Sequence, residues 1–445
     1  MNPFSTQKIN GLPLYLFRIA LGALLSIFTL FLIRRVFLVH KITFSQNNIP
    51  YFDFIIYPSP TILLFLLTLL LASTILMMLG KYFKFASICT LLISLYIFLL
   101  YLEKFNNHFY LLLLVVAILA FTNADKGLSL QKNQNQFIPQ WQLNLLRLQF
   151  IIPYTFSGVQ KLLDPDWING ILIQERLSAI NHHTVFKGID TVIWSPVVGK
   201  IAISFDLLIG LFLISKKTRL WAVLGLITFH AINYFIIFGP IASKYDSVGI
   251  FPYIGLISCI LFLDETQICK IVTNCQNTLQ KITNYFNQKT FSSPSKSIIR
   301  PYIASLIIIF ILLLPVYRYT NYEDMYWKDT IIGSWNSHSF FKTGTLNVYY
   351  QHNLTGQWIL YPAPKSILPP NLKALNSPKG QAALIRYVKS DMESYGLFVP
   401  YVGFISEITI NNSKQKKFEG ILPWEDITQD RFEKEFTKPI PESKR

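Results

Sequence analysis

Residues 61–80 read TILLFLLTLLLASTILMMLG, a run of 20 residues that contains no charged side chain. A helix of about 20 apolar residues is long enough to cross the ~30 Å hydrocarbon core of a bilayer. Water cannot satisfy backbone groups there, so the chain must do so itself as a continuous helix. This run therefore predicts a transmembrane helix.

Comparable runs occur on both sides of this one. The sequence predicts about nine spans, at residues 12–33, 61–80, 85–102, 109–122, 143–163, 192–215, 219–238, 248–263 and 299–316. The run at 109–122 is short for a span, so it is either tilted, re-entrant or extended through residues 106–108. Residues 264–298 are polar and basic, which predicts a loop or surface helix outside the bilayer.

The composition of the whole chain agrees with a membrane protein. Hydrophobic residues make up 52% and charged residues only 14%, whereas soluble domains carry about 25% charged residues. The net charge of +16 is explained by basic residues that flank apolar spans on the cytoplasmic side. No zinc-binding spacing, phosphate loop or RNA-binding motif is present, so we expect neither a metal site nor a nucleic-acid partner.

The composition changes after about residue 316. Alternating apolar and polar residues at 345–350 and 403–410 predict half-buried strands, and residues 380–395 predict a helix between them. We therefore predict a mainly α-helical polytopic membrane domain at 1–316, followed by a β-rich extramembrane α+β domain at 317–445.

Charge gives the orientation. With a cytoplasmic N-terminus, the inner segments carry 13 Lys and Arg residues and the outer segments carry 9. The positive-inside rule favours this arrangement. Nine spans then place the C-terminal domain on the outer side of the membrane.

Ionisable residues at membrane depth point to function by default. Lys161, Asp164 and Trp167 follow directly on a long apolar segment. One interpretation is an interfacial anchor, in which Lys161 snorkels, Asp164 caps a helix and Trp167 lies in the aromatic belt. The other is a buried lysine base, because a low dielectric disfavours the charged form of an amine.

Two further polar groups have the same two interpretations. Asn107 and His108 lie between the third and fourth predicted spans, and His230 and Asn233 lie one helical turn apart in the seventh. Polar residues in such positions commonly link helices by hydrogen bonds. Polar residues in such positions are also found in substrate sites.

The order of these motifs resembles the vitamin K-dependent γ-glutamyl carboxylases and their bacterial relatives, the horizontally transferred transmembrane (HTTM) family. The signature of that family is similar to a central motif here, formed by Tyr154, Gly158, Lys161, Asp164, Asp166, Trp167 and Gly170. An upstream Asn-Asn-His motif is matched at 106–108, and Phe-His-x-x-Asn at 229–233. The paired lysines of the family are Gln160 and Lys161 here.

The resemblance implies an integral membrane enzyme. In the family, oxidation of vitamin K hydroquinone by O₂ to its epoxide drives removal of a γ-hydrogen from a peptide glutamate, which then captures CO₂. By resemblance, Lys161, His108 and Asn107 are catalytic, and Tyr154, Gly158, His230 and Asn233 bind the quinol. The expected partners are membrane lipid, a lipophilic naphthoquinol and a glutamate-containing peptide, at a bacterial inner membrane with the C-terminal domain in the periplasm.

Two alternatives accompany this interpretation. The chain is either a quinol epoxidase without carboxylation, or a non-enzymatic quinone- or lipid-binding scaffold or transporter that kept the fold. Both agree with the presence of His108 and Lys161. They differ in whether a reduced naphthoquinone is converted to its epoxide.

Overall fold

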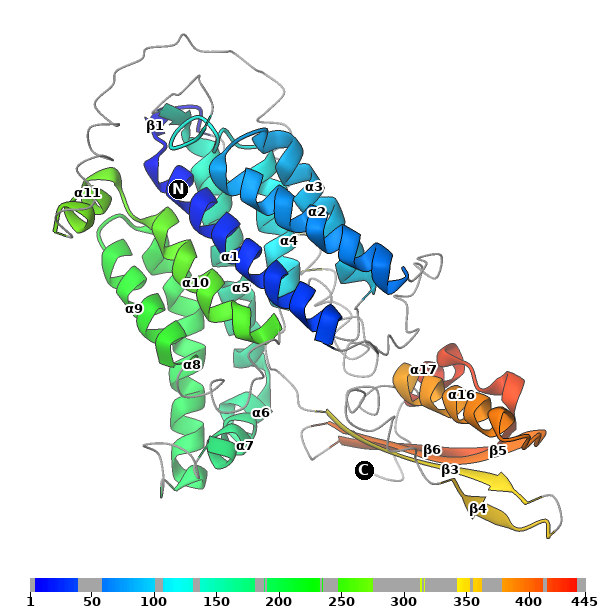
Figure 1. Ribbon diagram of the computed structural model, residues 1–445. Helices are drawn as coiled ribbons and strands as arrows, with labels where there is room; N and C mark the ends of the chain where they lie inside the picture. Colours follow the sequence, from blue (N-terminus) through cyan, green and yellow to red (C-terminus); the bar gives the residue numbers. More distant parts are fainter. Residues whose placement is uncertain are drawn as a thin grey trace.

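A computed structural model of the chain describes residues 5–38, 58–100, 107–130, 137–180, 190–232, 247–274, 342–352, 355–361, 378–410 and 414–437, together with the single residues 188, 234, 313 and 316. The described residues form a bundle of helices, followed in the sequence by a small sheet with two helices (Figure 1). The chain is thus mostly helical, with strands in its C-terminal region.

The bundle contains eight helices of 14 to 27 residues. They are α1 (Leu12–Leu38), α2 (Pro60–Leu79), α3 (Phe83–Leu100), α4 (Asn107–Ala120), α5 (Gln140–Leu163), α8 (Thr191–Ile214), α9 (Arg219–Ile232) and α10 (Ser247–Phe262). Shorter elements are α6 (Pro165–Ile168), α7 (Ile171–Ile180), α11 (Glu265–Asn274) and a two-stranded sheet of β1 (Lys8–Asn10) and β2 (Phe137–Pro139).

Eight of the nine predicted spans are therefore helices in the structure. Four of these helices are long and apolar enough to cross a membrane: α1 (over Leu12–Arg34), α2, α3 and α8. Three are apolar but shorter, namely α4, α9 and the Ile250–Phe262 part of α10. The ninth predicted span, 299–316, lies outside the described residues except for two isolated positions, so the number of nine spans stays a prediction.

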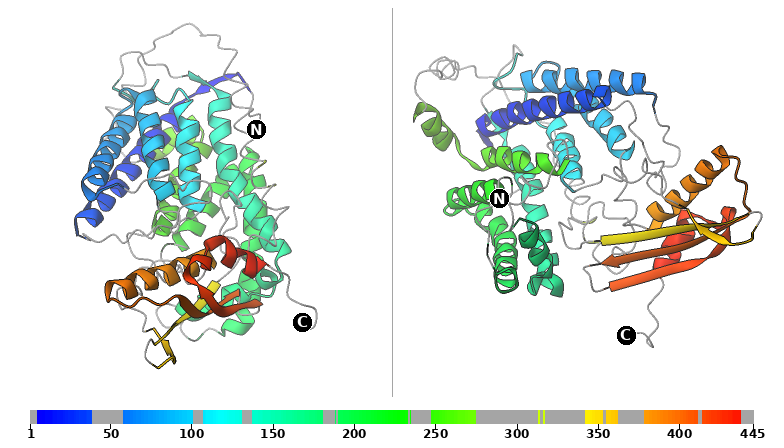
Figure 2. Two further views of the ribbon diagram at one scale, coloured as in Figure 1. Left: turned by 90° about the vertical axis from the view of Figure 1, so that its right-hand side faces the viewer. Right: turned by 60° about the horizontal axis from the view of Figure 1, so that its bottom comes forward.

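The helix α5 differs from the other long helices. Its sequence, QWQLNLLRLQFIIPYTFSGVQKLL, is the least hydrophobic of the long helices, yet most of its residues are buried. It packs against α4, α8 and α10, while α1, α2 and α3 lie on one side of the bundle and α8 and α9 on the other (Figure 2). Polar side chains on α5 therefore face protein.

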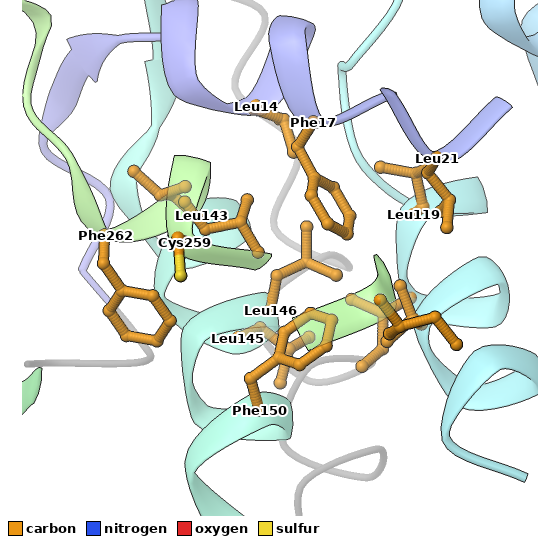
Figure 3. Packing of buried hydrophobic residues seen from close by; sticks show 14 of the residues in the cluster. Leu14, Phe17, Leu21, Leu119, Leu143, Leu145, Leu146, Phe150, Cys259 and Phe262 are labelled. Carbon is orange, nitrogen blue, oxygen red and sulfur yellow. The ribbon is translucent and has the colours of Figure 1, made fainter. Parts of the chain in front are cut away.

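The apolar core of the bundle is built around α5. Leu14, Phe17 and Leu21 of α1 meet Leu143, Leu146 and Phe150 of α5, and Phe262 of α10 closes the cluster (Figure 3). The rings of Phe17 and Phe150 pack edge to face with centroids 5.9 Å apart. This core holds α1, α5 and α10 together.

Glycines bring α5 and α8 into close approach. A Cβ added at Gly158 would lie 2.8 Å from the backbone nitrogen of Leu207, and one added at Gly210 would lie 2.9 Å from Oγ1 of Thr155. Small residues at a crossing let two backbones approach closely, which is typical of helices in membranes. The approach sets the position of α8 relative to the last turns of α5.

The C-terminal region forms an antiparallel sheet in the order β4-β3-β5-β6. Its elements are β3 (Lys342–Gln351), β4 (Trp358–Leu360), β5 (Tyr401–Ile410), β6 (Lys414–Pro423), the helices α16 (Pro378–Ser394) and α17 (Gln429–Thr437), and a short 3₁₀ turn at Trp424–Asp426. Both predicted strands and the predicted helix are present. α16 and α17 cover one face of the sheet, and their contacts form a core separate from that of the bundle (Figure 1).

The close approach of α5 and α8 makes a testable prediction about stability. Gly158→Ala forces the backbone of α8 to move, so we expect it to destabilise the protein by about 1–3 kcal/mol, as overpacking does. The matched control is Gly225→Ala on α9, whose added Cβ would meet its nearest neighbour at 3.7 Å. Thermal unfolding of the purified protein in detergent measures both. Equal midpoints for the two variants would contradict this account of the crossing.

Candidate functional site

The predicted site residues lie toward one end of the bundle. Successive helices run in opposite directions, since three residues connect α2 to α3 and four connect α8 to α9. His108 is near the start of α4, Lys161 is near the end of α5, and His230 is near the end of α9. Each of these positions falls at the end of the bundle that carries α6 and α7 (Figure 1).

Lys161 is buried and forms an ion pair. Its Nζ lies 2.6 Å from Oδ2 of Asp206 on α8, and the exposed fractions of the two side chains are 9% and 5%. The Nζ also lies 4.6 Å from the centroid of the Trp167 ring, at a distance suited to a cation–π interaction. The lysine therefore reaches into the protein and does not snorkel toward water.

The turn after α5 positions Trp167. Asp164 ends α5 and caps α6, because its Oδ1 accepts a hydrogen bond from the backbone N–H of Asp166 at 2.9 Å, and Pro165 occupies the first turn. Trp167 is only 5% exposed. The anchor interpretation is thus correct for Asp164 as a cap, and wrong for Lys161 and Trp167, because both side chains are buried.

His230 and Tyr154 form a second buried pair. The Tyr154 hydroxyl lies 2.7 Å from Nε2 of His230, and the histidine is fully buried. Nδ1 of His230 has no hydrogen-bond partner among the described residues. A Cβ at Gly255 of α10 would lie 2.0 Å from Nε2, so only glycine leaves room for the imidazole at that point.

Phe251 connects the two predicted histidines. His108 stacks on the Phe251 ring with centroids 3.8 Å apart and planes at 21°, and His230 meets the same ring edge to face at 5.0 Å. His108 and the neighbouring Asn107 are 8% and 9% exposed. The three aromatic rings thus form one continuous group contributed by α4, α9 and α10.

The structure connects the two ends of the predicted site through α5. Tyr154, Gly158 and Lys161 lie on one face of this helix, and Tyr154 and Lys161 are seven residues or about 10 Å apart along its axis. From His108 the contacts run through Phe251 and His230 to Tyr154, and Lys161 lies two turns further along α5. That His108 and Lys161 face one cavity stays a prediction, and Asn233 lies outside the described residues.

Comparison with known protein families identifies residues 6–266 as an HTTM domain, a range that covers more than half of the chain. The chain belongs to the HTTM domain family. This domain is the one found in the vitamin K-dependent carboxylase family. No solved structure matches the chain.

All predicted site residues lie inside the HTTM domain, and the C-terminal sheet lies outside it. The sequence analysis missed Asp206 and assigned no role to Phe251. Asp206 could have been found, because it is the single acidic residue within an apolar helix and a charge at that depth indicates function. Phe251 ends the segment 248–251, which resembles the Ile-Gly-x-Phe segment of the family, but only the fold places its ring between two histidines.

The pair of Tyr154 and His230 yields a prediction about stability. Tyr154→Phe leaves Nε2 of a fully buried imidazole without its partner, so we expect a loss of about 1–3 kcal/mol in the free energy of unfolding. The control is Tyr253→Phe, which removes a hydroxyl 2.9 Å from that of Tyr234 at a side chain that is 42% exposed. We expect this control to change stability by about 0.5 kcal/mol or less. Unfolding in mixed micelles measures the stability of both variants. Equal losses of stability would show that burial of the hydrogen-bonded groups does not determine the loss.

Proposed function

We propose that this HTTM-domain protein is an integral membrane enzyme of the vitamin K-dependent carboxylase type. It would couple the oxidation of a naphthoquinol to its epoxide with the carboxylation of a glutamate in a peptide. The observation that carries the proposal is the buried Lys161, held by Asp206 within a domain of this family. When bound, the quinol would be oxidised by O₂, and this oxidation would drive removal of the glutamate γ-hydrogen. CO₂ would then add to the γ-carbon.

The described residues suit a planar quinol. The stacked rings of His108 and Phe251 and the indole of Trp167 offer flat aromatic surfaces. If the Tyr154 hydroxyl donates to Nε2 of His230, the ring proton lies on Nδ1, where it is a buried donor suited to a ligand oxygen. We therefore assign quinol contacts to Tyr154 and His230, and by resemblance to Gly158 and Asn233.

The proposed catalytic roles follow from burial and charge. Lys161 receives a proton from the quinol hydroxyl, while Asn107 and His108 position the reactants. All three side chains are in surroundings with little access to water. Exclusion of water matters, because a strong base or a carbanion formed at the site would otherwise take its proton from solvent.

The partners of the reaction are expected to arrive from different phases. A lipophilic quinol can enter from the bilayer and a peptide from water. O₂ and CO₂ are small and apolar enough to arrive by either route. The C-terminal α+β domain is the part of the chain that we propose to meet the peptide.

The substitution Lys161→Arg tests the proposed base. Arginine can keep an ion pair with Asp206, but guanidinium does not give up its proton. We expect epoxide formation from a reduced naphthoquinone to fall by about 10²–10⁴-fold, the usual contribution of a general base, with little change in unfolding. Lys200→Arg on the exposed face of α8 is the matched control and should keep full activity. Full activity in Lys161→Arg would show that the lysine serves only as a cation.

The same assay separates the alternatives. Purified protein is given the reduced quinone, a glutamate-containing peptide and labelled bicarbonate, and both epoxide and labelled peptide are measured. Epoxide with labelled peptide supports the carboxylase. Epoxide alone would make the protein a quinol epoxidase. If neither product forms, the protein is a binding protein or a transporter.

The distribution of charge supports a periplasmic C-terminal domain in a bacterial inner membrane. The end of the bundle opposite the site carries the exposed residues Lys8, Lys81, Lys216 and Lys217 on β1 and on the α2–α3 and α8–α9 connections. Basic residues mark the cytoplasmic side. The end that carries Lys161 would then face the periplasm.

Native cysteines allow this orientation to be tested. Cys269 on α11 is exposed at the end expected to be cytoplasmic, and no cysteine occurs after Cys275. We expect a membrane-impermeant maleimide to leave the native protein unlabelled in intact spheroplasts, and to label the variant Tyr395→Cys, whose position in the C-terminal domain is 75% exposed. Lysed spheroplasts should label Cys269 in both. Labelling of native protein in intact spheroplasts would reverse the topology.

A further inference from the structure

Asp206 is the one acidic residue of α8, a helix of 24 residues that is long and apolar enough to cross a membrane. The residue is 3% exposed. An isolated carboxylate at such a position is costly, and charged residues within spans usually face the protein interior and pair with one another. Asp206 follows this rule, because its partner is Lys161.

The fold fixes this pair. Because Gly158 has no side chain, the backbone of α8 at Asp206 and Leu207 lies directly against α5. Lys161 is on the next turn of α5, so its side chain reaches the Asp206 carboxylate at 2.6 Å. On the other side, the Trp167 ring covers the Nζ. The amine therefore has a carboxylate, an aromatic face and little water around it.

A carboxylate at this distance favours the ammonium form of a lysine. An ammonium group cannot accept a proton unless it gives one up. The sequence analysis considered burial alone, whereas the structure places a carboxylate oxygen 2.6 Å from the amine. Two groups this close bind and release protons as a unit.

We propose that Asp206 is the positioning residue and proton partner of Lys161, so that the two residues together form the proton-accepting group of the site. This inference rests on the proposed function. The resting pair is ammonium and carboxylate, with no net charge. As Nζ forms a new N–H bond with an incoming acidic proton, the N–H bond that faces Asp206 breaks and that proton moves to Oδ2. The pair ends as ammonium and carboxylic acid, with one proton gained, and the electron pair of the broken O–H bond stays on the donor oxygen.

The other titratable side chains near the pair lie on α5, α6, α8 and α9. Tyr154 and His230 share a hydrogen bond two turns away on α5 and α9. Asp164 caps α6 through Oδ1, and Asp166 follows it on α6. On α8 the nearest other ionisable residue is Lys200, which is exposed. Among the residues that the structure describes, Asp206 is thus the carboxylate that forms an ion pair with Nζ.

The pH dependence of Asp206→Asn tests the proposal. In the native protein the final acceptor is a carboxylate, so epoxide formation should persist down to the mildly acidic range in which carboxylates become protonated. In Asp206→Asn only the amine can accept the proton, so activity should fall by about 10²-fold or more at neutral pH and recover as the pH rises. Asp206→Glu should retain the native profile. A purely structural role would lower activity by the same factor at every pH.

A matched control is available on the same helix. Asp190 caps α8 through hydrogen bonds from the backbone N–H groups of Val192 and Ile193, and asparagine caps helices equally well. Asp190→Asn should therefore leave both the pH profile and the stability close to those of the native protein. A shifted profile in this control would mean that the loss of a carboxylate that does not contact Lys161 suffices, which overturns the proposal.

A second readout needs no turnover. In the ligand-free protein with ¹³C-labelled lysine side chains, the Cε signal of Lys161 is assigned by its disappearance in Lys161→Arg. We expect this signal to show an ammonium group at neutral pH in the native protein, and to change to that of the neutral amine at a lower pH in Asp206→Asn than in the native protein. An unchanged signal would overturn the pairing. If the signal changes but native protein forms no epoxide, the proposed function fails and the pairing stands. If native protein forms epoxide and Asp206→Asn keeps the native pH profile, the present inference fails alone.

Discussion

Charged side chains inside a membrane protein have almost no water to solvate them, and Lys161 and Asp206 meet this constraint by pairing at 2.6 Å. Each group alone would be an uncompensated buried charge, and breaking such a pair typically costs about 3–5 kcal/mol. The pair therefore requires α5 and α8 to stay at one fixed separation. Gly158 and Gly210 make that separation possible, because a side chain at either position would push the helices apart.

The same constraint explains the position of α5 in the bundle. A helix facing lipid can expose apolar side chains, as α2 does with Phe65 and Leu69, but it cannot expose amides or guanidinium groups without cost. α5 carries such groups and is surrounded by protein. Arg147, for example, donates from Nε to the carbonyl oxygen of Leu261 at 2.7 Å, where α10 ends. The polar helix is thus held in the interior by hydrogen bonds to its neighbours.

Aromatic packing gives the site its second component. Phe251 lies between His108 and His230, so α4 meets the consecutive helices α9 and α10 at one group of rings. The group contains polar atoms only where imidazole nitrogens and the Tyr154 hydroxyl lie. An arrangement of flat apolar surfaces with few polar atoms suits a planar, lipid-soluble ligand better than a charged one.

Much of the fold followed from the sequence. Charge-free runs such as 61–80 identify their helices, because only a helix satisfies every backbone group in hydrocarbon, and alternation at 403–410 identifies β5. Order and spacing of polar motifs placed Lys161, His108 and His230 in one family signature. By contrast, only the tertiary structure decided that Lys161 is paired. Its partner is 45 residues away on another helix, and sequence patterns report periodicity within a helix but not which faces of distant helices meet. The chemistry expected of Lys161 depends on the contact between α5 and α8. This contact places a carboxylate beside the amine, and the two groups then share the available protons.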